Sequence, residues 1–238
     1  MSTQPFKFKQ FEVAQERCAM KIGTDGVLLG AWAPVDHNPF SILDIGAGSG
    51  LISLMLAQRS HAELIDAVEI NADAYEQCVE NFEASVWNDR LFCYHASLEE
   101  FTDEIEDLYE LIVSNPPFFS ETYPSGNDAR DAARQNQSLP PSLLVNSVCQ
   151  LLHPKGVFAL IIPFKEEKQF LQLARDKNLY PFAIKRVKGS HNTPVKRSLI
   201  ALSFNEKSPV ETELVIESNR HEYTEGYISL TKDFYLKM

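Results

Sequence analysis

Apolar residues recur along the chain in short runs that alternate with longer amphipathic stretches. Continuous apolar runs predict buried strands, and apolar residues three and four apart predict helices. The predicted strands cover residues 41–45, 64–70, 91–95, 109–113, 156–162, 182–187 and 199–204. The predicted helices cover residues 51–59, 72–84, 139–152 and 165–177. This alternation indicates an α/β fold with a mostly parallel seven-stranded sheet and helices on both faces.

The two ends of this pattern carry additional elements. The short link 189–196 between the last two predicted strands indicates a hairpin, and therefore an antiparallel edge strand. Near the N-terminus, aromatic and polar residues alternate over 6–11, which predicts a short β-ribbon. A helix over 27–32 would be capped by Thr24 or Asp25 and ended by Pro34. The aromatic residues would either cover one end of the core or form a lid over a ligand.

A glycine-rich turn follows the first predicted strand. Asp44, Gly46, Gly48 and Gly50 stand two residues apart, unlike the Gly-x-Gly-x-x-Gly pattern of dinucleotide sites. Glycines allow a tight turn and close approach of a ligand, and the next helix offers unpaired N–H groups to an anion. Glu69 ends the second predicted strand, where a carboxylate can accept both ribose hydroxyls of a nucleoside. The turn therefore predicts a site for a nucleoside-containing cofactor.

Asn115, Pro116, Pro117 and Phe118 follow the fourth predicted strand. Two prolines remove two backbone donors and fix two φ angles, so that the Asn115 amide and nearby carbonyls are held as acceptors. The aromatic ring offers a face for a flat group. Together these residues can hold a planar amine by its edge and its face. The alternative is an ordinary turn at a strand end.

The net charge of −11 is unevenly distributed. Residues 60–121 contain sixteen acidic residues and one basic residue, a net charge of −15, so the rest of the chain carries +4. Two arginines lie in the long polar stretch 119–140, and five cations lie within an acid-free segment. We expect these to contact RNA phosphates, with solvated surface charge as the alternative. They are Arg130, Arg134, Lys185, Arg186, Lys188, Lys196 and Arg197.

Several classes of protein are not indicated. The four cysteines form no C-x-x-C pair, the six histidines lack metal-ligand spacing, and no nucleophile elbow or paired carboxylates are present. No apolar run reaches the length of a membrane span, and residues 1–11 lack the apolar core of a signal peptide. We therefore expect a cytoplasmic monomer that binds neither metal nor membrane.

The two motifs together resemble those of class I methyltransferases that methylate amino groups, over about residues 40 to 205. The run from Arg17 to Trp32 further resembles the bacterial tRNA1(Val) (adenine-37-N6)-methyltransferases, and the chain length agrees. The resemblance implies a Rossmann-like class I fold with the methyltransferase domain at 40–238. Residues 1–39 would form an N-terminal extension whose ribbon and helix act as a lid or flank the cofactor.

The resemblance also implies a cofactor, S-adenosylmethionine, which leaves as S-adenosylhomocysteine. Its site would be formed by Thr24, Asp25, Asp44, Gly46, Gly48, Gly50, Glu69, Ile70, Ser97 and Asn115. In the family, the position of Ser97 is commonly an acid that accepts from the adenine amino group of the cofactor. Ser97 departs from this pattern, which leaves adenine recognition open.

The implied reaction moves a methyl group to the exocyclic N6 of adenine 37, next to the anticodon of tRNA. Asn115, Pro116, Pro117 and Phe118 would be the catalytic residues. Because conjugation delocalises the lone pair of such an amine, the site must favour a tetrahedral nitrogen. Glutamine amides of proteins and amino groups of rRNA present the same problem and remain alternatives. A silent RNA-binding module is a further alternative.

Overall fold

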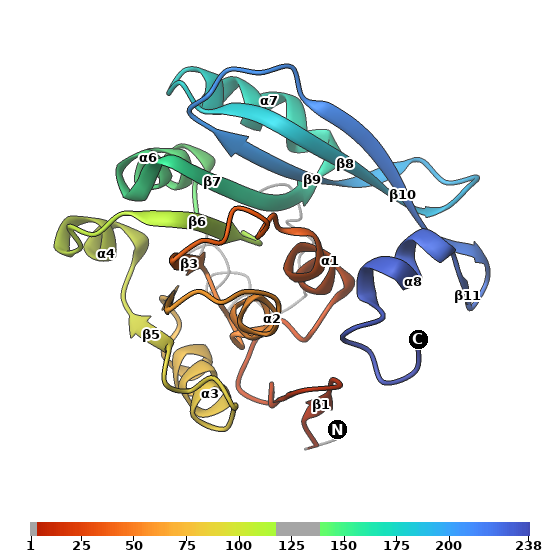
Figure 1. The fold of residues 1–238 in the computed structure, drawn as a ribbon, viewed down its shortest axis with the longest axis horizontal. Coiled ribbons are helices and arrows are strands. Elements are labelled where there is room, and N and C mark those ends of the chain that lie inside the picture. The colour runs from red at the N-terminus through yellow and green to blue at the C-terminus, as the bar shows by residue number, and fades with distance from the viewer. Residues whose placement is uncertain (1–3, 118–138) are drawn as a thin grey trace, which may run out of the picture.

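The computed structural model describes residues 4–117 and 139–238, and Figure 1 shows their fold. A nine-stranded sheet runs in the order β11-β10-β8-β9-β7-β6-β3-β4-β5. Its first strands are β3 (Ser41–Ile45), β4 (Leu64–Glu69), β5 (Leu91–His95) and β6 (Tyr109–Ser114). The others are β7 (Leu152–Pro163), β8 (Tyr180–Ser190), β9 (Val195–Ser203), β10 (Val210–Asn219) and β11 (Glu222–Tyr223). The predicted α/β fold is confirmed, with two strands more than the seven expected.

The strands missed by the sequence pattern lie at one edge of the sheet. β10 pairs in parallel with β8, and β11 pairs antiparallel with β10. Most β10 side chains are exposed or half-buried, and its apolar run is limited to Leu214–Ile216 with an acid on either side, so the strand was not predicted. The β8–β9 hairpin is confirmed, but its antiparallel strand β9 lies between β7 and β8 and not at the edge.

Helices cover both faces of the sheet. One core contains side chains of α1 (Thr24–Trp32), α2 (Leu51–Arg59), α3 (Ala72–Glu83) and α8 (Glu225–Thr231). The other contains side chains of α4 (Leu98–Glu104), α6 (Pro141–Leu151) and α7 (Phe164–Arg175). Adjacent strand residues such as Ile42 and Leu43 belong to opposite cores, as the alternation of side chains in a strand requires. None of the described helices has the length and apolarity to cross a membrane.

Two helix starts differ from the expectation. The cap of α1 is Gly23, with no side-chain hydrogen bond, so the prediction of Thr24 or Asp25 as cap was wrong. Both residues lie in the first turn instead. α4 was not predicted from the sequence, because its seven residues give little periodicity.

The N-terminal residues pack against the C-terminal end of the chain. The predicted ribbon is confirmed as β1 (Phe6–Lys7) paired with β2 (Glu12–Val13). The Lys9 amide donates to the Phe234 carbonyl at 2.8 Å, and Phe8 forms a bridge with Tyr235. Phe8 belongs to the same core as α1 and α2. These aromatic residues thus cover one end of the core, while the division of the chain at residue 40 remains a prediction.

Candidate active site

The predicted site residues meet at the carboxyl edge of the sheet. Ile45 is paired with Val68 on one side and with Ser114 on the other. The residues next after these three are Gly46, Glu69, which ends β4, and Asn115. Three neighbouring parallel strands therefore deliver the turn, the acid and the amide to one place, the usual ligand-binding edge of an open α/β sheet.

The glycine turn is formed by three residues with positive φ, namely +75° at Gly46, +57° at Gly48 and +77° at Gly50. A Cβ added at Gly46 or Gly48 would meet no atom within 4 Å, so their outer sides face open space. At Gly50 it would lie 2.5 Å from the Phe82 ring and 2.8 Å from Cys78 Sγ. The first two glycines thus leave room for a ligand, and the third allows α3 to pack closely against the turn.

The carboxylate of Glu69 is already bonded to the backbone on both sides. One oxygen accepts from the Gly48 amide at 2.8 Å, and the other accepts from the Asn71 amide at 2.8 Å. Each oxygen has a second lone pair, which can accept a ribose hydroxyl. Glu69 therefore holds the turn in place, and its predicted contact with the cofactor is compatible with this arrangement.

Asp44 lies beneath the turn and is completely buried. Its Oδ2 accepts from the hydroxyl and the amide of Ser53 at 2.7 and 3.2 Å, whereas Oδ1 has no partner among the described residues. Burial raises the pKa of Asp44 to about 7, against the hydrogen bonds from Ser53, which lower it. The structure thus places Asp44 as an anchor between β3 and α2.

Asn115 is half-buried at the tip of β6, and its Oδ1 is buried without a partner in the described part of the chain. Pro116 is buried next to it. Phe118, Arg130 and Arg134 lie outside the described residues, so their predicted roles stay predictions. Buried polar groups are normally hydrogen-bonded, so a buried acceptor without a partner is a candidate site for an N–H donor of a ligand.

Two predicted cofactor residues lie on the side of β4 and β5. Ile70 follows Glu69 and is 48% exposed, so it offers an apolar surface next to the acid. Ser97 caps α4: its hydroxyl accepts from the Glu100 amide at 3.2 Å, and the Glu100 carboxylate accepts from the Ser97 amide at 2.9 Å. This capping box explains a serine at this position structurally, and its contact with adenine remains a prediction.

The N-terminal segment reaches the site through two long-range contacts. Asp25 Oδ2 accepts from Arg197 Nε at 2.8 Å, which ties the start of α1 to the start of β9. Asn81 of α3 bonds the amide and the carbonyl of Ala14 at 2.9 and 2.8 Å. Asn81 also donates to the Ser49 carbonyl in the glycine turn at 2.8 Å. The only sequence signal for Asn81 was a polar residue on the apolar side of a predicted helix.

Three of the five predicted RNA-contacting cations that the structure describes have acidic partners. Arg186 pairs with Glu167 at 2.7 Å and with Glu211, and Lys188 pairs with Glu213 at 2.7 Å. Arg197 pairs with Asp25, as described above. Lys185 is half-buried, and burial lowers its pKa. The segment is free of acids in sequence, but β10 and α7 bring acids to it in space, so only Lys196 remains exposed without an ion-pair partner among the described residues.

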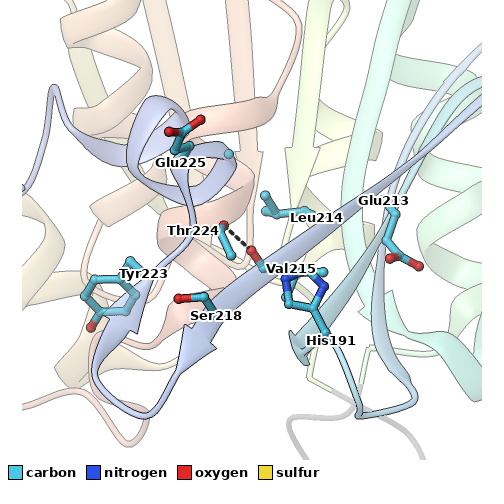
Figure 2. A pocket seen from close by; sticks show the side chains of 9 residues that line it. His191, Glu213, Leu214, Val215, Ser218, Tyr223, Thr224 and Glu225 are labelled. Carbon is cyan, nitrogen blue, oxygen red and sulfur yellow. Dashed lines mark hydrogen bonds between the residues drawn. The ribbon is translucent and has the colours of Figure 1, made fainter.

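A separate pocket of about 520 Å³ lies between the β8–β9 hairpin, β10, β11 and the start of α8. Figure 2 shows His191 on one side of it and Tyr223 on the other. Thr224, at the cap of α8, donates to the Val215 carbonyl. None of the predicted site residues lines this pocket, and the chemistry described above lies elsewhere.

Comparison with known proteins agrees with this geometry. The model of the family described as methyltransferase small domain matches residues 28–135. Among solved structures, the fold is similar to that of a predicted O-methyltransferase from Agrobacterium tumefaciens. The two structures superpose with a TM-score of 0.66 and 15% sequence identity, and the match covers 88% of this chain and 96% of the other. A putative RNA methyltransferase from Pyrococcus horikoshii has a TM-score of 0.52 at 14% identity, over 70% and 74% of the two chains.

Relatives with much higher sequence identity are full-length matches. The tRNA1(Val) (adenine(37)-N6)-methyltransferase of Flavobacterium johnsoniae is 62% identical over 98% of this chain and 100% of its own length. The protein of the same name from Pectobacterium carotovorum is 44% identical over 98% of this chain and 94% of its own. The chain therefore belongs to the tRNA1(Val) (adenine(37)-N6)-methyltransferase family.

Proposed function

We propose that the protein transfers a methyl group from S-adenosylmethionine to N6 of adenine 37 in tRNA1(Val), the reaction named for its full-length relatives. The observation that carries the proposal is the buried Oδ1 of Asn115 beside the glycine turn, which has no partner among residues 4–117 and 139–238. We further propose that the protein acts as a monomer in the cytoplasm.

The residues at the sheet edge fit this cofactor. Space is open at Gly46 and Gly48, and the glycine turn leads into the N-terminus of α2, which favours a carboxylate. Glu69 has lone pairs for ribose hydroxyls, and the exposed Ile70 can cover an apolar ring face. When bound, S-adenosylmethionine supplies an electrophilic methyl group on a sulfonium.

The chain itself has to position the amine and make its nitrogen nucleophilic. Asn115 Oδ1 and the Pro116 carbonyl would accept the two amino protons, which draws the nitrogen toward a tetrahedral geometry with a localised lone pair. Phe118 would hold the base by stacking. Most of the acceleration would come from this positioning, and the released proton can leave to water. An adenine in an anticodon loop is readily unstacked, so it can enter such a pocket at modest cost.

The test is methylation of unmodified tRNA1(Val) with labelled cofactor, followed by nuclease digestion and mass analysis of the nucleosides. We expect N6-methyladenosine at position 37 and no product from a tRNA with guanine at that position. Label in protein or in rRNA, with none in tRNA, would contradict the proposal and favour a glutamine or rRNA substrate. Light scattering of the same sample tests the monomer.

A further inference from the structure

The carboxyl edge carries an exposed aromatic side chain that the proposed reaction does not use. Phe164 follows the end of β7 and is 42% exposed. β7 is the immediate neighbour of β6, with Leu160 paired to Ser114. Asn115 is thus level with Ile161, and Phe164 follows three residues later, about 10 Å along the strand direction.

The Phe164 ring is supported from one side by a fixed cation. The Arg186 guanidinium carbon lies 5.7 Å from the ring centroid. Arg186 is held in place by its ion pairs with Glu167 and Glu211. Glu167 is buried and also accepts from Ser198, so α7, β8 and β9 together fix the guanidinium. A ring that is backed by such a cation and exposed elsewhere is a rigid surface for a planar partner.

The surroundings of Phe164 favour a nucleic acid over a protein partner. Lys165 and Lys196 are exposed near the ends of β7 and β9 and have no ion-pair partner in the described part of the chain. Lys165 follows Phe164 in the chain, and Lys196 precedes Arg197, which is paired with Pro163, so both bring positive charge close to Phe164, while Glu167 and Glu211 are paired with Arg186. Aromatic rings next to lysines are how proteins hold unpaired bases of single strands, by stacking and phosphate attraction.

We propose that Phe164 stacks an unpaired base next to the methylated adenine in the anticodon loop, and that Arg186 supports the ring instead of contacting phosphate. This inference rests on the proposed function and assigns part of its RNA surface. An anticodon loop that places one base at Asn115 brings a flanking nucleotide toward Phe164.

The experiment uses Phe164→Leu, which keeps apolar bulk but removes the ring, and Phe164→Tyr, which keeps the ring. The control is Phe40→Leu, since Phe40 is also exposed, at 56%, but precedes β3 at the opposite edge of the sheet. RNA binding and single-turnover rates are measured on the anticodon stem-loop of tRNA1(Val). Two further RNAs lack the base on the 5′ or the 3′ side of the target.

We expect Phe164→Leu to weaken RNA binding about tenfold, within the range for loss of one base stack. The rate at saturating RNA and the cofactor affinity should stay unchanged, and Phe164→Tyr and Phe40→Leu should bind as the parent does. On one of the two abasic RNAs the difference between Phe164→Leu and the parent should vanish. The inference is overturned if Phe164→Leu binds like the parent, or if its defect persists on both abasic RNAs. If the parent fails to methylate any tRNA, the proposed function itself fails.

Discussion

Asn115 and Asp44 lie at the same edge of the sheet, and each has a buried side-chain oxygen. Each has one oxygen without a partner in the described part of the chain. A buried acceptor left unpaired costs about 1–3 kcal/mol, so it is retained where a ligand can supply the donor. Asn115 lies at the tip of β6, whereas Asp44 lies beneath the turn and is bonded to Ser53. This difference supports our proposal that Asn115 binds the substrate; Asp44 holds β3 to α2, and its predicted contact with the cofactor stays a prediction.

Replacing Asn115 by Ala should lower methyl transfer by about a hundredfold, the scale for removing one preorganised hydrogen-bonding group aimed at a transition state. The free energy of unfolding and the cofactor affinity should change little, because the lost amide oxygen has no partner among the residues that the structure describes. Single-turnover rates at saturating tRNA measure this, with Asn88→Ala at the exposed opposite edge as control. If Asn115→Ala transfers methyl groups as fast as the parent, residues 115–118 form an ordinary turn and the proposed role of Asn115 is wrong.

Asp44 predicts a pH dependence of stability. Its pKa rises on folding from an ordinary value near 3.8 to about 7, so the folded state holds the proton more tightly than the unfolded state. The stability that this gives is complete below pH about 4 and is lost as the pH rises to about 7, at up to about 1.4 kcal/mol per pKa unit. Asp44→Asn should remove this loss. Melting temperatures of the two proteins between pH 4 and 8 test it, and parallel curves would contradict it.

At the scale of elements, the glycine turn connects β3 to α2, packs against α3 and borders the space proposed for the cofactor. Gly50 is packed against α3, whereas Gly46 and Gly48 border open space. Asn81 of α3 then connects this turn to the N-terminal segment. The turn is therefore shaped by α3 as much as by its own sequence.

Replacing Gly50 by Ala should mainly lower the free energy of unfolding, whereas replacing Gly48 by Ala should mainly weaken cofactor binding. Both variants strain a positive φ, at about 1–2 kcal/mol. Gly50→Ala additionally forces its Cβ against Phe82, so it should lose about 2–5 kcal/mol of unfolding free energy in total. Gly48→Ala should remain closer to the parent in stability but bind cofactor more weakly. Urea unfolding and calorimetric titration of the cofactor test this. Equal unfolding free energies of the two variants would mean that α3 shifts to accommodate the added methyl group.

Replacing Asn81 by Leu should loosen the N-terminal segment. The amide and the carbonyl of Ala14 and the Ser49 carbonyl lose their partner, at a cost of at least about 2 kcal/mol. Amide exchange over residues 14–22 should accelerate. Arg17→Met is the control, since it removes only exposed ion pairs between the same segment and α3. If both variants exchange alike, Asn81 does not hold this segment.

At the scale of the whole molecule, charge is redistributed by the fold. The sequence separates an acidic segment from a basic one, but β10 lies beside β8 and pairs its acids with Arg186 and Lys188. The cations left for RNA are those without such partners, of which Lys196 is near the proposed site. The basic surface available to RNA is therefore smaller than the sequence predicts.

Lys196→Met and Lys188→Met should differ in their effect on the salt dependence of tRNA binding. Loss of Lys196 should reduce the slope of log affinity against log salt by about one, as expected for one phosphate contact. Loss of Lys188 should leave the slope nearly unchanged, because its charge is already compensated by Glu213. Filter binding across a salt series measures both slopes. Equal slopes for the two variants would mean that the ion pair opens on RNA.

The sequence by itself determined the features that depend on neighbouring residues. Apolar runs marked seven of the nine strands of the sheet, and the glycines marked the turn because only they adopt its φ values readily. Since parallel strands end at a common edge, the sequence also indicated that Glu69 and Asn115 would meet there.

Only the tertiary structure decided the features that depend on residues far apart in the chain. β10 has only a short apolar run and gains its place largely by backbone pairing with β8, and the acids it brings neutralise cations more than twenty residues away. Asn81 reaches Ala14 across 67 positions, and Arg197 reaches Asp25 across 172. Hydrogen bonds and ion pairs leave no periodic trace in sequence, because each needs only two complementary groups that the folded chain brings within 3 Å.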